Sequence, residues 1–134
     1  MKIEHVAFNV SDPAAMANWY RDHLGLTIVR RMEEPPFTHF LRDSGGTMLV
    51  EVYRNPPDSV PSYRDMHPLT LHLAFISEDP EGDKAALIGA GATLVEEQRP
   101  QAGSHLVMMR DPWGFSIQLC KRSVSMFTTP GTKA

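Results

Sequence analysis

The sequence has a single cysteine and lacks long hydrophobic segments. Cys120 is the only cysteine among the 134 residues, which excludes an intrachain disulfide and is typical of a reducing compartment. The N-terminal segment MKIEHVAFNVSDP reaches an acid and a proline before any apolar run long enough for a signal peptide or a membrane anchor. We therefore expect a cytoplasmic protein from which no targeting segment is removed.

An excess of charge of one sign is also missing. The net charge is -3, with acidic and basic residues interspersed along the chain. Because no basic stripe is present to attract a phosphate backbone, nucleic acid is not an expected partner. The hydrophobic share of 42% and the charged share of 22% are those of an ordinary soluble protein, which argues against disorder and against a membrane-spanning chain.

The sequence does contain an internal repeat. Residues 5–13 read HVAFNVSDP and residues 72–80 read HLAFISEDP, so five of nine positions are identical at an offset of 67 residues. About half an identity is expected by chance over nine positions. The same offset aligns Glu51 with Gln118 without a gap. We therefore expect two similar halves.

Each half is predicted to fold as a strand, a helix and three further strands. In the first half, Asp12 is a typical N-cap with Pro13 at the first helical position, and Gly25 is a typical helix stop. Apolar periodicity and turn residues predict the remaining bounds. The predicted strands cover residues 3–10, 26–32, 37–42, 47–53, 69–76, 93–97, 105–109 and 115–120, and the second helix covers residues 80–88.

These elements predict an α+β fold built from two tandem βαβββ modules. The modules are residues 3–53 and 69–121, and the proline-rich segment 54–68 is the expected linker. Together they are expected to form one domain of residues 1–122, with a curved eight-stranded sheet or partial barrel around a cleft. Residues 123–134 are expected to form a loose or partner-docked tail.

Strand alternation predicts which way the polar residues point. In each half the apolar residues of the first and fourth strands suit the side that faces the helix. His5 and Glu51 are therefore expected on the opposite side in the first half, and His72 and Gln118 in the second. All four would line the concave side of the sheets.

This pattern resembles the vicinal oxygen chelate superfamily, which includes glyoxalase I, bleomycin-resistance proteins and extradiol dioxygenases. In that superfamily a histidine opens the first strand, an acid closes the fourth, a histidine lies in the fifth, and an acid follows a D-P-x-G turn in the eighth. Those positions hold His5, Glu51, His72 and Gln118, and the turn is present as DPWG. The phrase WYRDHLGL at the end of the first helix is also similar, and the resemblance covers residues 2–122.

The resemblance implies that these four residues bind one divalent metal ion. Imidazole nitrogens with carboxylate or amide oxygens suit Zn, Ni, Co, Mn or Fe(II), and such an ion polarises a carbonyl and eases removal of a neighbouring proton. The expected activity is a lyase or isomerase reaction of the lactoylglutathione lyase type on a small substrate or thioester. Gln118 departs from the pattern because an amide cannot take a proton, so Glu51 is the candidate base.

Substrate contacts are expected from five further residues. Asn9 stands where glyoxalase I has an arginine that helps to hold glutathione, which argues against that substrate. Asn55 and Arg99 lie near positions where glyoxalases contact substrate, although Arg99 also suits a solvated loop. Tyr53 and Trp113 suit an apolar cleft or the core.

Two other functions stay open. Two histidines and an acid also suit an Fe(II) extradiol dioxygenase. Gln118 also fits a position that has lost its metal-binding role, as in a metal-free binding protein of the bleomycin-resistance type. An alternative interpretation of Glu51 is a solvent-facing residue on an edge strand. The family further implies a homodimer.

The histidines without a partner at the repeat offset are interpreted as surface or pocket-rim residues, namely His23, His39, His67 and His105. Met108 and Met109 are interpreted as core.

Overall fold

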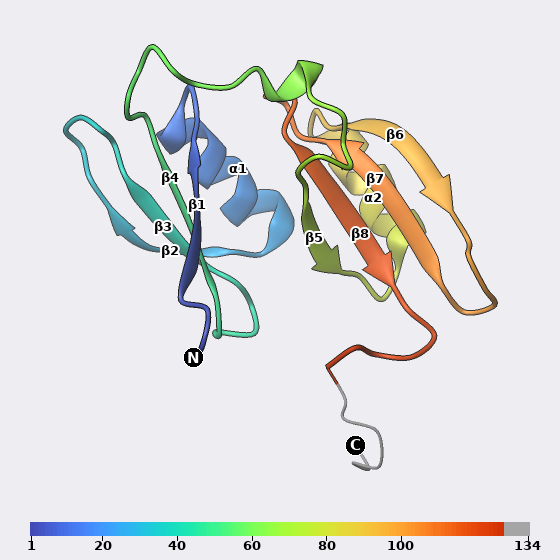
Figure 1. The fold of residues 1–134 in the computed structure, drawn as a ribbon. Helices are drawn as coiled ribbons and strands as arrows, with labels where there is room; N and C mark the ends of the chain where they lie inside the picture. Colours follow the sequence, from blue (N-terminus) through green and yellow to red (C-terminus); the bar gives the residue numbers. More distant parts are fainter. Residues whose placement is uncertain (128–134) are drawn as a thin grey trace. The chain divides into compact units, whose positions relative to one another are not determined.

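The computed structural model describes residues 1–127, which form two successive βαβββ modules (Figure 1). The first contains β1 (His5–Asn9), α1 (Pro13–Leu24), β2 (Thr27–Arg31), β3 (His39–Arg42) and β4 (Leu49–Tyr53). After the short 3₁₀ helix η1 (Tyr63–Asp65), the second contains β5 (Leu73–Ile76), α2 (Pro80–Gly89), β6 (Thr93–Gln98), β7 (His105–Arg110) and β8 (Ser116–Lys121). The predicted α+β fold is confirmed. Residues 128–134 of the predicted tail lie outside the described residues.

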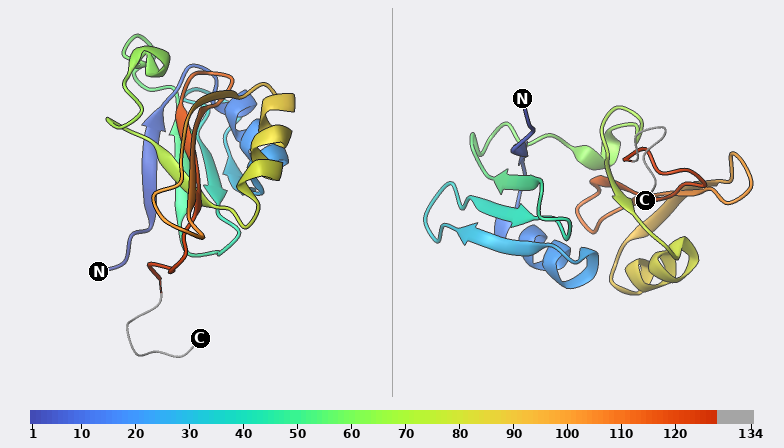
Figure 2. Two further views of the ribbon diagram at one scale, coloured as in Figure 1. Left: turned by 90° about the vertical axis from the view of Figure 1, so that its right-hand side faces the viewer. Right: turned by 90° about the horizontal axis from the view of Figure 1, so that it is seen from below.

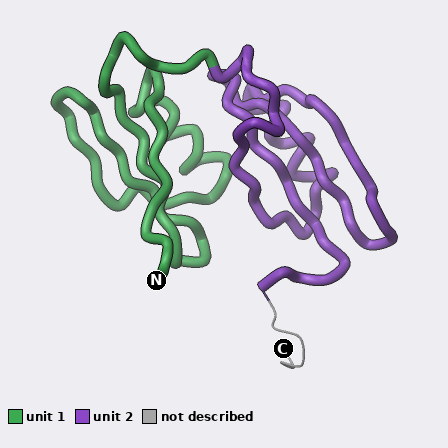
Figure 3. The backbone as a smooth tube through the Cα atoms, viewed as in Figure 1, with its two compact units in different colours: residues 1–62 green, residues 63–134 purple. Residues whose placement is uncertain are grey.

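The strands form two mixed sheets of four. Their orders are β1-β4-β3-β2 and β5-β8-β7-β6, with β1 parallel to β4 and β5 parallel to β8. Neither sheet is closed, and one helix lies against one face of each (Figures 1 and 2). The chain divides into two compact units, Met1–Ser62 and Tyr63–Ala134 (Figure 3). Each unit thus contains one module, and the boundary falls within the predicted linker.

Side-chain capping starts both helices where the sequence predicted. The carboxylate of Asp12 accepts a hydrogen bond from the N–H of Ala15 at 3.1 Å, and Asp79 caps α2 in the same way. Each N-cap satisfies one of the backbone donors that a helix start leaves unpaired. At the other end of α1, Gly25 adopts φ 72°, and its N–H donates to the carbonyl of Tyr20. A left-handed residue of this kind ends a helix cleanly.

Each unit has its own apolar core between its helix and its sheet. In unit 1 the buried side chains include Met16, Tyr20, Leu41, Val50 and Val52, and in unit 2 they include Leu87, Val107, Met109, Ile117 and Leu119. Burying one such side chain stabilises the fold by about 1.5–3 kcal/mol. Met108 and Met109 are both buried, which confirms their interpretation as core.

The pairing registers correct one detail of the repeat. Leu41 and Met109 face equivalent residues of β4 and β8, so an offset of 68 residues relates β3 to β7. Equivalent bulges follow Ile28 and Leu94, so an offset of 66 relates β2 to β6. The expectation of a gapless repeat is therefore wrong for the second and third strands of each half, whereas the helix and the first and fourth strands keep the offset of 67. The differences fall in turns, where added or missing residues cost little.

The segment before β5 also differs from the prediction of a strand over residues 69–76. Residues 68–70 form a turn in which the N–H of Thr70 donates to the carbonyl of His67 at 2.9 Å. Upstream, the guanidinium of Arg110 donates to the carbonyls of Tyr63 at 2.9 Å and Met66 at 2.8 Å. These bonds fix the start of unit 2 to the end of β7, so His72 precedes the strand rather than lying in it.

None of the helices in the described part of the chain is long and apolar enough to cross a membrane.

Candidate functional site

Unit 1 brings His5 and Glu51 together. They lie on the adjacent parallel strands β1 and β4, where Glu51 pairs with Ala7, two residues after His5. The Nε2 atom of His5 is 3.3 Å from Oε2 of Glu51. On the other side of the ring, Nδ1 of His5 is 2.9 Å from the carboxylate of Glu4. The imidazole is thus held between two carboxylates, with Nε2 directed at Glu51.

Unit 2 contains His72 and Gln118. Nδ1 of His72 donates to the carbonyl of Pro68 at 3.0 Å, and Nε2 has no hydrogen-bond partner within residues 1–127. Gln118 pairs with Ala74, two residues after His72, and its Oε1 accepts from the thiol of Cys120 at 3.2 Å. Burial raises the pKa of Cys120, which keeps the thiol protonated and able to donate.

The four side chains fit a divalent transition metal by their chemistry. Both histidines bind an oxygen through Nδ1 and leave Nε2 as the available nitrogen, as metal-ligating histidines do. Glu51 and Gln118 supply oxygen donors beside them. His5 and Glu51 belong to unit 1 and His72 and Gln118 to unit 2, so one metal ion shared by all four stays a prediction.

Two of the expected substrate-binding residues bond to one another. Oδ1 of Asn9 accepts from the backbone N–H of Asn55 at 2.8 Å, and Nδ2 of Asn9 donates to the carbonyl of Pro56 at 2.9 Å. The amide of Asn9 therefore holds the segment that leaves β4. Asn55 is exposed at the start of that segment. Their role towards substrate stays a prediction.

The other three residues expected to contact the substrate lie in different elements. Tyr53 is half-buried at the end of β4, paired with Asn9. Trp113 is half-buried in the turn after β7, where its backbone N–H donates to Asp111 at 2.9 Å. Arg99 follows β6 and forms an ion pair with Glu81 at 3.3 Å. These contacts leave the predicted roles of Tyr53, Trp113 and Arg99 untested.

Unit 2 also contains a group of potential metal ligands that the sequence did not reveal. One ligand atom from each of Glu81, Glu97 and His105 lies within 4.8 Å of the others. His105 is only 4% exposed and lines a pocket, and His39 is 5% exposed. The interpretation as a surface or pocket-rim residue is therefore wrong for His39, whereas His105 lines a pocket and His23 and His67 are exposed as expected. Alternation with Val107 and Met109 on β7 was the available signal that His105 faces the helix.

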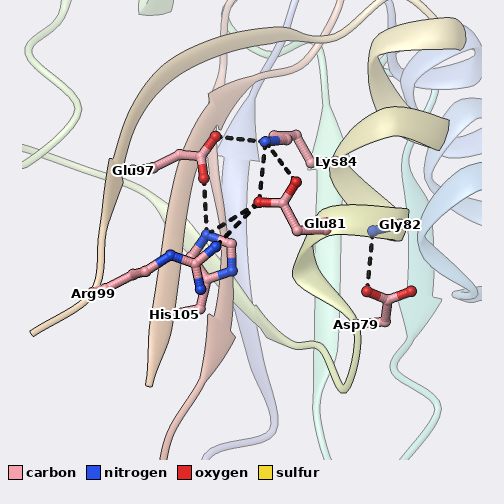
Figure 4. Close-up of polar contacts among 7 residues, drawn as sticks. All are labelled: Asp79, Glu81, Gly82, Lys84, Glu97, Arg99 and His105. Carbon is pink, nitrogen blue, oxygen red and sulfur yellow. Dashed lines mark hydrogen bonds and ion pairs between the residues drawn. The ribbon is translucent and has the colours of Figure 1, made fainter. Parts of the chain in front are cut away.

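Two cations neutralise this group (Figure 4). Lys84 of α2 lies 2.6 Å from Glu97 and 3.1 Å from Glu81, and Arg99 contacts Glu81. The hydrogen bonds from Lys84 and then from His105 lower the pKa of Glu97, while those to Glu97 and Glu81 raise the pKa of Lys84. The group therefore joins α2 to β6 and β7 as a network of charged side chains.

Solved structures with the same fold cover nearly all of the chain. One is an antibiotic-binding protein from a Streptomyces species, 17% identical with a TM-score of 0.69, covering 90% of this chain and 94% of that one. Another is a superfamily member from Sphaerobacter thermophilus, 18% identical with a TM-score of 0.68, covering 90% and 96%. A glyoxalase family protein from Enterococcus faecalis is 29% identical with a TM-score of 0.65, covering 89% and 96%.

The fold is that of the glyoxalase/bleomycin resistance protein/dioxygenase superfamily, also called the vicinal oxygen chelate superfamily. Within it, residues 5–120 match the family model described as a glyoxalase-like domain, and the chain belongs to that family. No curated protein is significantly similar to it in sequence. The family includes glyoxalase-related enzymes, and the superfamily includes proteins that bind small molecules.

Proposed function

We propose that this protein is a metal-dependent lyase or isomerase of the glyoxalase I type, acting on a small carbonyl compound or thioester. The arrangement of His5 carries the proposal. Its Nδ1 is held by Glu4 and its Nε2 lies 3.3 Å from a carboxylate oxygen of Glu51. An imidazole oriented in this way beside a half-buried acid is suited to metal binding and to proton transfer.

His5, Glu51, His72 and Gln118 would hold one divalent ion of Zn, Ni, Co, Mn or Fe(II). When bound, the ion supplies a positive charge that polarises a substrate carbonyl. Glu51 is the base in this proposal because it is the only carboxylate among the four residues. It removes the proton from the carbon next to the carbonyl and returns it to the carbonyl carbon. Gln118 contributes only an oxygen, and Asn9 fixes the chain segment that carries Asn55.

Metal content and proton exchange test this proposal. Protein purified without chelators is compared with His72→Ala and with a control, His23→Ala, which removes an exposed histidine outside the set. We expect His72→Ala to lose one equivalent of metal and His23→Ala to lose none. Metal-replete protein should incorporate solvent deuterium into the product from an α-keto hemithioacetal or an acyl thioester. Unchanged metal content in His72→Ala, or no exchange with either substrate class, would refute it.

One observation favours a second candidate, a small-molecule-binding protein without a metal. Oε1 of Gln118, the oxygen that a metal needs, already accepts a hydrogen bond from Cys120. A similar fold occurs in a protein described as antibiotic-binding. Tight binding of a cationic drug by protein that contains no metal would select this function.

We also propose a homodimer, as the family resemblance implies, and a cytoplasmic location, as the single cysteine suggests. Sedimentation velocity should then give about twice the chain mass of 15.0 kDa, and a species of the chain mass alone would contradict the dimer.

A further inference from the structure

The group Glu81, Glu97 and His105 lies on the opposite face of its sheet from Gln118. On β7, His105 alternates with Val107 and Met109 on the face covered by α2, and Glu97 of β6 pairs with Val107. Gln118 pairs with Met108, whose side chain points the other way. The group is therefore separate from the ligand positions that the family resemblance predicts.

Each carboxylate in this group contacts both Lys84 and His105. Lys84 lies 2.6 Å from Oε1 of Glu97, and it contacts both oxygens of Glu81, Oε2 at 3.1 Å and Oε1 at 3.3 Å. Oε2 of Glu97 is 2.9 Å and Oε1 of Glu81 is 3.7 Å from Nε2 of His105 (Figure 4). Lys84 thus holds both acids beside the imidazole, as outer partners of metal ligands do.

The distances match those between atoms that share a metal ion. Ligand atoms at about 2.0–2.1 Å from a tetrahedral zinc ion are about 3.3–3.4 Å apart. The observed values of 2.9 and 3.7 Å lie on either side of that separation. Side-chain shifts of a few tenths of an ångström would bring each oxygen to that distance from Nε2, and the three ligand atoms all lie within 4.8 Å of one another.

His105 supplies a second, independent observation. Its side chain is 5% exposed, and its ring lines a pocket of 240 Å³ together with Glu81 and Ser104. The pocket offers space for water or a further ligand beside Glu81 and His105. Three protein ligands with an open position are the arrangement of a catalytic rather than a purely structural zinc site.

We propose that Glu81, Glu97 and His105 bind a divalent metal ion of the zinc class, at a site distinct from the one proposed for His5 and His72. Two carboxylates against one fixed ammonium group, that of Lys84, leave the site with a net negative charge. Arg99 contacts Oε1 of Glu81, but its side chain is 62% exposed, so it can turn into solvent when a metal binds. Arg99 therefore competes with the ion.

Titration with Zn²⁺ alone tests the site. The starting protein is the double variant His5→Ala/His72→Ala, stripped with a chelator, which removes the other proposed site. We expect one Zn²⁺ per chain by calorimetry. Adding Glu81→Gln should weaken binding by at least about tenfold, since losing even an outer partner of a ligand costs 10–100-fold. Adding His39→Ala, which removes a buried strand histidine in unit 1, should leave binding unchanged.

Glu81 is the safest ligand to change because its side chain is 57% exposed, and circular dichroism verifies that the variant is folded. Arg99→Gln should bind Zn²⁺ several-fold more tightly, because a competing cation is removed. Absence of Zn²⁺ binding by the double variant would overturn the proposal. So would equal affinity with and without Glu81→Gln, or equal affinity with and without Arg99→Gln.

Discussion

Glu51 and Gln118 occupy equivalent positions in the two halves, yet only one of them can exchange a proton. Each lies on the strand parallel to the first strand of its module, and each pairs with an alanine two residues beyond a histidine. The backbone therefore presents both in the same way, and the difference between them is purely chemical. In the proposed reaction, the carboxylate next to His5 would be the base and the amide next to Cys120 would be a neutral ligand.

Replacing Glu51 by Gln should separate these roles. An amide oxygen can still bind a metal, as proposed for Gln118, but it cannot accept a proton. We expect Glu51→Gln to bind the metal more weakly but still to load in excess metal, while deuterium exchange of the loaded protein falls by about 10²–10⁴-fold, the usual contribution of a general base. Metal analysis beside the exchange rate measures both. Glu4→Gln, which alters only the outer partner of His5, is the control and should fall far less. An equal loss in both variants would contradict the role of Glu51.

The sequence predicted part of the site at this scale. The repeat and the alternation of strand side chains predicted that His5 and Glu51 share a face, and the structure brings them to 3.3 Å. The hydrogen bonds of Asn9 to the segment after β4 could not be predicted from the sequence, because they depend on the path of a loop. The contacts of His105 with Glu81 and Glu97 could not be predicted from the repeat, because they depend on how α2 packs against β6 and β7.

Most of the elements follow from local signals. Both helices begin at Pro13 and Pro80 after capping aspartates, as predicted, and all eight strands exist. The errors lie at the ends of strands, most clearly at residues 69–72, where a turn bonded to His67 replaces predicted strand. Alternating apolar residues predict a strand, but they carry no information about a backbone bond that ends it.

The turn at Gly114 provides a sharp test of local packing. Gly114 has φ 87°, and a Cβ there would lie 2.6 Å from Cβ and 2.9 Å from Cα of Arg64. Gly46 has φ 72° with open space around it. Gly46→Ala should cost about 1–2 kcal/mol from left-handed strain alone. Gly114→Ala should cost clearly more, because Arg64 must also move. Urea unfolding measures both, and equal costs would show that the contact with Arg64 is easily relieved.

The link between α2 and β6 should make stability depend on pH. Lys84 and then His105 hold the pKa of Glu97 below its usual value of about 4.3. A carboxylate with a lowered folded pKa adds stability above its unfolded pKa and loses it as the pH falls through the folded pKa. We expect Glu97→Gln to lower the melting temperature at pH 7 and to converge with the parent below about pH 4.

Asp22 is the matched control for this pH dependence. Its pKa is also lowered, by a hydrogen bond from Arg21, but both side chains lie on the helix surface. Exposed pairs contribute little to stability. Asp22→Asn should therefore change the melting temperature less than Glu97→Gln at pH 7. A difference between Glu97→Gln and its parent that stays constant down to pH 3 would contradict the assignment to this ion pair.

At the scale of the whole molecule, each unit has a separate core and half of the predicted ligand set. Relatives with 17–29% identity share the fold over about nine tenths of the chain. The core of each unit therefore tolerates wide changes in sequence as long as apolar residues keep facing the helix. The proposed metal ligands face away from the helices, so they can vary without loss of the fold. This separation explains how one fold carries both enzymes and binding proteins.

If one metal ion takes ligands from both units, it should stabilise both. A ligand that binds only the folded state adds about 2.7 kcal/mol when its free concentration is one hundred times its dissociation constant. We expect metal to raise the melting temperature of the parent chain and chelation to reverse the rise. His5→Ala in unit 1 and His72→Ala in unit 2 should each remove the part of this increment that the shared ion supplies, whereas His23→Ala should keep it. Because Glu81→Gln acts on the separate site in unit 2, it should remove only the part that persists in His72→Ala. An increment abolished by His72→Ala but retained in His5→Ala would instead place the ion within unit 2 alone.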